Sequence, residues 1–324
     1  MKQFITAFLL SAFFIFAAIY GLILAVDPYN KFGYNVFGFE TKAVSFAREN
    51  KYNQVEHAKK NYTAFIMGTS SAHRYYTKDL NRLTGLESYN YSTQSATPED
   101  YIAMTRHVFT KYRPKLILIS FGFEDLNKFT VTDDMFYSSP LKKHLEEVPA
   151  EELERDLFNN SYLTLEAIAD SVQVIWVNLF GEARHAYLEN GDHVVEPTAQ
   201  TLLLSQAGYA EYEISQERIG YLKTLKKLCD EQGTKVVVLT TPLSLEHLNI
   251  IRNNPKLRPQ FEQYKQTLVN IFGELWDFQH DGIAPYNTLE YFRDSIHPTH
   301  HLSTIVLEDI FGTAGPKIGK LIKR

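Results

Sequence analysis

A serine, a histidine and an aspartate, placed in two widely separated segments, are the side chains of this chain best suited to chemistry. The apolar residues 64–67 run into Gly68-Thr69-Ser70, and Asp294-Ser295-Ile296-His297 precedes a helix-like stretch near the C-terminus. A serine hydroxyl becomes a nucleophile when a base takes its proton, and the base needs a carboxylate that fixes its tautomer. Ser70, His297 and Asp294 are therefore predicted to be a nucleophile, a general base and an orienting acid.

Other interpretations of these segments stay open. Gly68-Thr69-Ser70 is also what an ordinary strand-to-helix turn looks like, and Asp294 could be the N-cap of the last helix. Ser71 is a second candidate nucleophile, although Ser70 has the expected spacing from Gly68. His73 and Arg74 lie one turn further along, and Arg74 could meet an anionic substrate, but a solvated helix face is the expected role.

A metal site is a further interpretation of the C-terminal segment. Asp294, His297, His300 and His301 are spaced so that several of them could share one helical face. Pro298 interrupts that turn, and no second segment supplies obvious ligands. We therefore expect no metal and no cofactor, with His300 and His301 at the surface where a helix begins.

The N-terminal region has the properties of a membrane anchor. Residues 4–26 carry no charge, and at about 1.5 Å per residue they are long enough to cross a hydrocarbon core of about 30 Å. Residues 24–28 offer no small-x-small cleavage site, which favours an uncleaved anchor. Because Lys2 precedes the span, the N-terminus is expected in the cytoplasm and everything after Val26 outside.

Composition limits what the exported part can be. The single Cys229 excludes an intramolecular disulfide framework, which fits an exported bacterial protein. The net charge of −5 disfavours a nucleic-acid partner. The basic residues 317–324 are expected to be a solvated helix end. After a juxtamembrane connection at residues 27–60, we expect one domain over residues 61–324.

Short apolar runs alternate with helical patterns along this domain. Alternation of this kind is typical of an α/β fold with a parallel sheet and helices on both faces. Ligands of such sheets bind at the carboxyl ends of the strands, and Ser70 follows the first strand. Residues 126–210 interrupt the rhythm and predict an inserted helical cap. The expected strands are residues 63–67, 88–91, 116–120, 235–240 and 275–278, and the clearest helices are residues 98–112, 214–232 and 257–272.

The nucleophile segment and the Asp-x-x-His segment, in this chain order, resemble those of the SGNH hydrolases, also called GDSL esterases. The resemblance covers roughly residues 60–315 and implies a flavodoxin-like three-layer sandwich. With the N-terminal span, Asp27-Pro28-Tyr29 and Pro298 after His297, the chain resembles the membrane-anchored bacterial subgroup. Members of that subgroup serve in alginate O-acetylation and teichoic-acid D-alanylation, often beside a membrane-bound O-acyltransferase.

The resemblance also assigns roles around the catalytic set. Ser70 would be the nucleophile, His297 the base and Asp294 its partner, with the Ser70 backbone N–H donating to the oxyanion. The family adds a glycine and an asparagine to that oxyanion hole. Residues 89–94 lack the glycine, and Glu124 stands where the asparagine is expected. The remaining candidates near the oxyanion or the substrate are Ser92, Gln94 and Asn127.

Two functions follow as expectations. The first is an extracytoplasmic, membrane-anchored serine esterase or O-acyltransferase that acts on a cell-envelope glycan or a related acylated polymer through an acyl-serine. The second is a catalytically weak or inactive scaffold that binds glycan beside a membrane-bound O-acyltransferase. Retention of the catalytic set favours the first, and the altered oxyanion segments favour the second.

Overall fold

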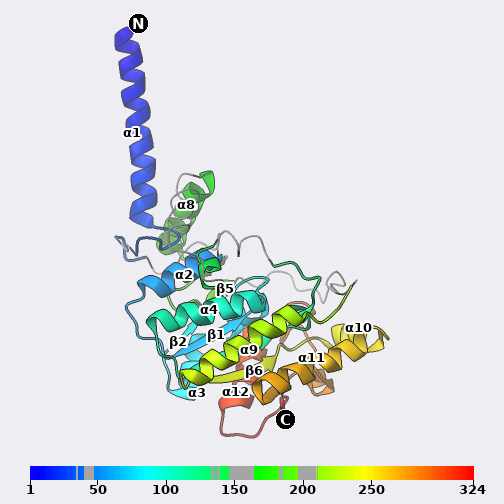
Figure 1. Ribbon diagram of the computed structural model, residues 1–324. Helices are drawn as coiled ribbons and strands as arrows, with labels where there is room; N and C mark the ends of the chain where they lie inside the picture. Colours follow the sequence, from blue (N-terminus) through cyan, green and yellow to red (C-terminus); the bar gives the residue numbers. More distant parts are fainter. Residues whose placement is uncertain are drawn as a thin grey trace. The chain divides into compact units, whose positions relative to one another are not determined.

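The chain forms two compact units. The computed structural model describes residues 1–33, 36–39, 47–132, 136, 139–145, 164–181, 185–195, 209 and 211–324. The first unit comprises Met1–Lys59, Glu147–Glu189 and Val194–Glu196, and the second comprises Lys60–Glu146, Asn190–His193 and Pro197–Arg324 (Figure 1).

The first unit is built around the apolar N-terminal helix α1 (Lys2–Val26). This helix is long and apolar enough to cross a membrane, and most of its side chains are exposed. In its last turn, Ile23 and Val26 are buried and pack with α8 (Leu165–Phe180). The unit also contains the polar but largely buried helix α2 (Ala47–His57) and part of a small sheet of β4 (His185–Tyr187) and β5 (His193–Val195).

The second unit contains a six-stranded sheet in the order β2-β1-β3-β6-β7-β8. The first five strands in this order are parallel, and the apolar runs predicted as strands all fall on them. Every residue of β1 and β3 is buried, as expected for strands covered on both faces. The strands are β1 (Ala64–Gly68), β2 (Ser88–Asn90), β3 (Leu116–Phe121), β6 (Lys235–Thr240), β7 (Glu274–Asp277) and β8 (Lys320–Lys323).

Helices cover both faces of this sheet. The chain moves outward from β1 through α3 (Thr77–Thr84) to β2 and then back through α4 (Pro98–Lys111) to β3, and right-handed crossovers in opposite directions place these helices on opposite faces. Helix α9 (Gln216–Glu231) packs between α4 and α11 (Leu257–Phe272), and these three helices lie side by side in Figure 1. Helix α3 packs with α12 (His300–Phe311).

Shorter helices complete the second unit. The 3-10 turns η1 (Ser70–Arg74) and η2 (Phe123–Leu126) follow β1 and β3 directly. The remaining short elements of the described part of this unit are α6 (Lys142–Leu145), α10 (Leu245–Asn253) and η4 (Asp281–Tyr286).

Two expectations need correction. The sheet is mixed rather than wholly parallel, because β8 pairs antiparallel with β7, with Leu275 opposite Ile322. The basic tail is therefore an edge strand and not a helix end. Within the insertion predicted at residues 126–210, residues 133–135, 137–138, 146–163, 182–184, 196–208 and 210 lie outside the described residues.

Candidate active site

A sharp turn at the end of β1 positions the candidate nucleophile. Gly68 has a φ of 156°, and a Cβ atom there would lie 2.6 Å from the Cβ of Ala72 and 3.0 Å from the carbonyl oxygen of Ser120 on β3. Only glycine allows this close approach of the turn to the neighbouring strand. Thr69 then caps η1, and its hydroxyl accepts a hydrogen bond from the backbone N–H of Ser71. Ser70 is thereby held at the carboxyl edge of the sheet.

Ser70, His297 and Asp294 form a continuous chain of hydrogen bonds. Ser70 Oγ lies 2.8 Å from His297 Nε2. His297 Nδ1 lies 2.9 Å and 2.8 Å from the two carboxylate oxygens of Asp294. All three residues are partly exposed, so a substrate can reach them. This is the order nucleophile, base, carboxylate that acyl transfer through serine requires.

Asp294 is held as a carboxylate. Burial opposes its ionisation, but hydrogen bonding to His297, the charge of His297 and the backbone N–H groups of Ile296 and His297 outweigh burial and lower the pKa of Asp294. Because an ionised carboxylate only accepts hydrogen bonds, the Nδ1 atom of neutral His297 carries the proton. Nε2 is then an acceptor for the Ser70 hydroxyl.

The geometry distinguishes Ser70 from Ser71. The Ser71 hydroxyl donates to the carbonyl oxygen of Ile296 at 3.0 Å and is nearly buried. It ties the nucleophile turn to the loop that carries His297, whereas the Ser70 hydroxyl faces the imidazole itself. Thr299, and not Asp294, occupies the N-cap position of α12.

Polar side chains at the end of β2 and just after it form hydrogen bonds with other groups of the protein. The Ser92 hydroxyl and the Ser92 backbone N–H both donate to the side-chain oxygen of Asn90, and Ser92 is fully buried. The Asn90 amide donates to the carbonyl oxygens of Ala72 and Tyr75 at the end of η1. Asn90 therefore supports the nucleophile turn, a role that the sequence did not indicate. Gln94 is exposed.

Glu124 lies at the carboxyl end of β3, next to β1. Its carboxylate packs against Gly122, where an added Cβ would approach a carboxylate oxygen to 2.7 Å. Burial raises the pKa of Glu124, while hydrogen bonds from its own backbone and from Tyr209, together with the charge of His297, partly offset this. The charge of His297, the candidate base, thus affects the ionisation of Glu124.

A second polar chain continues from Glu124. The Tyr209 hydroxyl lies 3.4 Å from the Glu124 carboxylate and 2.9 Å from His247 Nε2, and His247 Nδ1 lies 3.3 Å from Ser295 Oγ. Burial lowers the pKa of His247 to about 4, against the opposing charge of Asp294. His247 is therefore neutral at neutral pH. Sequence inspection missed Tyr209 and His247 because both lie far from either catalytic segment in the sequence.

Asn127 holds the chain segment that precedes α9. Its side-chain oxygen accepts from the backbone N–H groups of Phe129 and Glu213, and its amide donates to the carbonyl oxygen of Glu211. The side chain is buried. Its polar atoms are thus used in loop structure rather than aimed at Ser70.

The remaining histidines take other partners. His300 lies 3.3 Å from Asp79, and His301 lies 3.1 Å from Glu290. Within the described residues, no group of three potential ligands converges on a metal position. The expectation that His73 is solvated is wrong, because His73 is buried against His193, with their Nδ1 atoms 3.1 Å apart.

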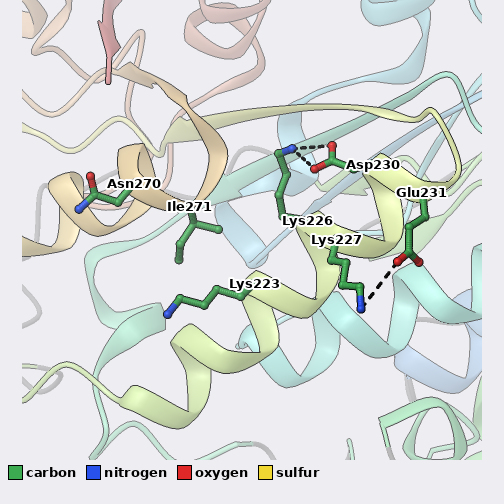
Figure 2. Close-up of a pocket in the computed structure, with 7 residues that line it drawn as sticks. All are labelled: Lys223, Lys226, Lys227, Asp230, Glu231, Asn270 and Ile271. Carbon is green, nitrogen blue, oxygen red and sulfur yellow. Dashed lines mark hydrogen bonds and ion pairs between the residues drawn. The ribbon is translucent and has the colours of Figure 1, made fainter.

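A separate hollow lies between α9 and α11 (Figure 2). Lys226 pairs with Asp230, and Lys227 lies 3.7 Å from Glu231 along α9, so these lysines are engaged within their own helix. Its other lining residues are Lys223, Asn270 and Ile271. The hollow contains none of the candidate catalytic side chains.

The chain matches no protein-family model, and no curated protein is significantly similar to it.

Proposed function

We propose that this protein is a membrane-anchored serine esterase or O-acyltransferase that works through an acyl-serine at Ser70. The observation that carries the proposal is the hydrogen-bonded chain from Ser70 Oγ through His297 to Asp294. Ser70 follows the parallel strand β1, and the loop before α12 brings Asp294 and His297 to it at the carboxyl ends of the parallel strands, where α/β proteins bind their ligands. The parallel strand order β2-β1-β3-β6-β7 is that of flavodoxin-like sheets and supports an SGNH-type fold.

The proposed reaction has two half-reactions. His297 Nε2 takes the proton of the Ser70 hydroxyl as Oγ attacks the ester carbonyl carbon, and a tetrahedral oxyanion forms. The oxyanion collapses, the alcohol leaves with the proton from His297, and an acyl-serine remains. An acceptor hydroxyl then gives its proton to His297 and attacks the acyl carbon, and the second tetrahedral intermediate releases Ser70 Oγ, which takes the proton back from His297. Water as acceptor gives hydrolysis, and a sugar hydroxyl gives transfer.

The start of η1 supplies one oxyanion donor in this scheme. The first backbone N–H groups of a helix have no carbonyl partner within that helix, and η1 begins at Ser70. We therefore propose the N–H of the nucleophile itself as a donor to the oxyanion.

The substrate proposal is an acylated cell-envelope glycan or a related polymer. Helix α1 supports it, because a helix that is long and apolar enough to span a membrane would tether the chain to the bilayer. The substrate class itself rests on the resemblance to the anchored SGNH subgroup. On this proposal the N-terminus is cytoplasmic and the second unit is extracytoplasmic.

The proposal is tested with the full-length protein in detergent or vesicles, an acetylated glycan and a chromogenic acetyl ester. Release or transfer of acetate should depend on Ser70 and persist in Ser71→Ala. Brief reaction followed by acid quench should add one acetyl group to the Ser70 peptide. Equal activity in wild type and Ser70→Ala would contradict the proposal.

A second function is favoured by one specific set of contacts. Glu124 stands where the resemblance predicts an oxyanion donor. Ser92 and Asn127 use their polar side-chain atoms in hydrogen bonds within the protein. A non-catalytic glycan-binding partner of a membrane-bound O-acyltransferase would tolerate such a site. Binding of the glycan by wild type and Ser70→Ala alike, without acyl turnover by either, would establish this second function over the first.

A further inference from the structure

Helix α8 is apolar on more than one face. Its last ten residues, 171–180, contain no charged side chain, and its only acidic residues are Glu166 and Asp170 near its start. A helix that is apolar all round is normally buried in protein or in lipid. The apolar side chains of α8 therefore need a protein or lipid environment.

One face of α8 packs on the end of α1. Ala167 and Val174 share an apolar cluster with Ile23 and Val26 of α1, and Figure 1 shows the green helix α8 beside the C-terminal end of the dark blue helix α1. Near the start of α8, the Tyr29 hydroxyl donates to Asp170 at 2.9 Å in a buried contact. Helix α8 is thus fixed against the point where the apolar span ends.

The other face of α8 is exposed and apolar. Val172 and Trp176 are each 52% exposed, Leu179 is 65% exposed and Phe180 is 61% exposed. Their spacing of four, seven and eight residues from Val172 places them in one stripe along the helix. The Trp176 and Phe180 rings are in contact, with centroids 4.4 Å apart. Free water would be an unfavourable environment for this stripe.

Two polar side chains on α8 are hydrogen-bonded to its own backbone. The Ser171 hydroxyl donates to the carbonyl oxygen of Ala167, and the Asn178 amide donates to that of Val174. Such back-bonding satisfies polar groups without water, as helices do where water is scarce.

We propose that α8 lies in the membrane interface, with its stripe of Val172, Trp176, Leu179 and Phe180 inserted among lipids of the leaflet where α1 leaves the bilayer. Lipid is the occupant because the stripe belongs to a helix packed directly on the end of the apolar span, and tryptophan and phenylalanine are suited to the membrane–water boundary. The inference rests on α1 spanning the membrane, as in the proposed function, but needs no catalysis.

The two tryptophans of the chain provide the test. Trp276→Phe leaves Trp176 as the sole tryptophan, and Trp176→Phe leaves Trp276, which lies in β7 of the central sheet. Full-length protein is reconstituted in phosphatidylcholine–phosphatidylglycerol vesicles with and without brominated acyl chains. We expect brominated lipid to lower Trp176 emission by about two-fold, as for a side chain about 5–10 Å below the headgroups. The same lipid should leave Trp276 emission unchanged.

Each other outcome overturns the inference. Quenching of Trp176 by aqueous iodide but not by brominated lipid would place the stripe in water. Protection from both quenchers would place it against protein, either a second copy or a membrane partner. The variant Phe14→Cys, in the middle of α1, tests separately whether α1 itself is embedded in the membrane. Labelling of that cysteine by an impermeant maleimide would refute the anchor, whereas protected Phe14→Cys with unquenched Trp176 would refute only the placement of α8.

Discussion

The two sides of the candidate site are built to different degrees for acyl transfer. On the proton-transfer side, Ser70, His297 and Asp294 are joined by contacts of 2.8–2.9 Å, and Asp294 is further held by two backbone N–H groups. On the proposed oxyanion side, Glu124 brings a carboxylate where the resemblance to SGNH hydrolases predicts a donor, and the polar atoms of Ser92 bond to Asn90.

This difference indicates that residues on the oxyanion side can be substituted one loop at a time, whereas the residues on the proton-transfer side depend on one another. The proton-transfer side sits on one local loop, Asp294 to His297, that meets one turn at Ser70. The proposed oxyanion side draws on the loops after two different strands, β2 and β3, so each loop can change its contacts alone. Altering the first side should therefore abolish chemistry, whereas altering the second should tune it.

The largest expected effect comes from the base. His297→Ala removes the proton acceptor of Ser70 and should lower turnover of an acetyl ester by about 10⁶-fold, or to background, because members of such a unit act together. Steady-state kinetics on the purified full-length variant measure this, with circular dichroism as the control for folding. Substantial remaining turnover would assign the chemistry to another group.

Asp294→Asn should have the next largest effect. The amide cannot hold the Nδ1 proton of His297 as the carboxylate does, so the imidazole loses its productive tautomer and turnover should fall by about 10⁴-fold. The side-chain oxygen of asparagine can still accept the hydrogen bonds from the backbone N–H groups of Ile296 and His297, so the melting temperature should change much less than turnover. Loss of folding in place of turnover would give Asp294 a structural role only.

Glu124→Asn sharpens the comparison in the opposite direction. In the proposed mechanism it replaces a carboxylate that would repel the oxyanion by an amide that would donate to it, and a single such donor is worth about 10²–10³-fold in other enzymes. We expect turnover to rise by about ten-fold or more, with a smaller rise for Glu124→Gln. A fall in turnover in both variants would mean that the carboxylate instead favours the protonated form of His297.

The smallest effect concerns stability and pH. The pKa of Glu124 is raised in the folded state above its ordinary value of 4.5. The folded state therefore binds more protons, and the contribution of this group, present below its ordinary pKa, is lost as pH rises through the folded pKa. Glu124→Gln lacks this titratable proton, so its melting temperature relative to wild type should increase as the pH rises above the ordinary pKa of 4.5. A constant difference over these pH values would place Glu124 in a water-like environment.

Local apolar patterns were sufficient to predict the central strands. β1 and β3 are buried along their whole length, and β6 is buried over its last four residues, because parallel strands are covered on both faces. β8 escaped prediction because it is an edge strand with lysines at both ends and mostly exposed side chains. Its identity depends on pairing with β7, which its own sequence does not encode.

Long-range contacts account for what was missed around the site. Ser70, His297 and Asp294 could be proposed from residue type and spacing, since each segment is short. The role of Asn127 depends on residues 211–213. Ser92 bonds to Asn90, and the Asn90 side chain is itself placed by the distant carbonyl groups of Ala72 and Tyr75, so neither role could be deduced from local sequence. The apolar pattern of α8 likewise predicts a helix but not its packing on α1.

The most direct test of the central claim is covalent labelling of the full-length protein with a fluorophosphonate, followed by peptide mass spectrometry. The Ser70 oxygen should displace fluoride at phosphorus, giving one adduct on the Ser70 peptide in wild type and in Ser71→Ala, and none in Ser70→Ala or His297→Ala. An adduct on another residue, or none in wild type under conditions that label a control esterase, would contradict the assignment of Ser70 as an activated nucleophile.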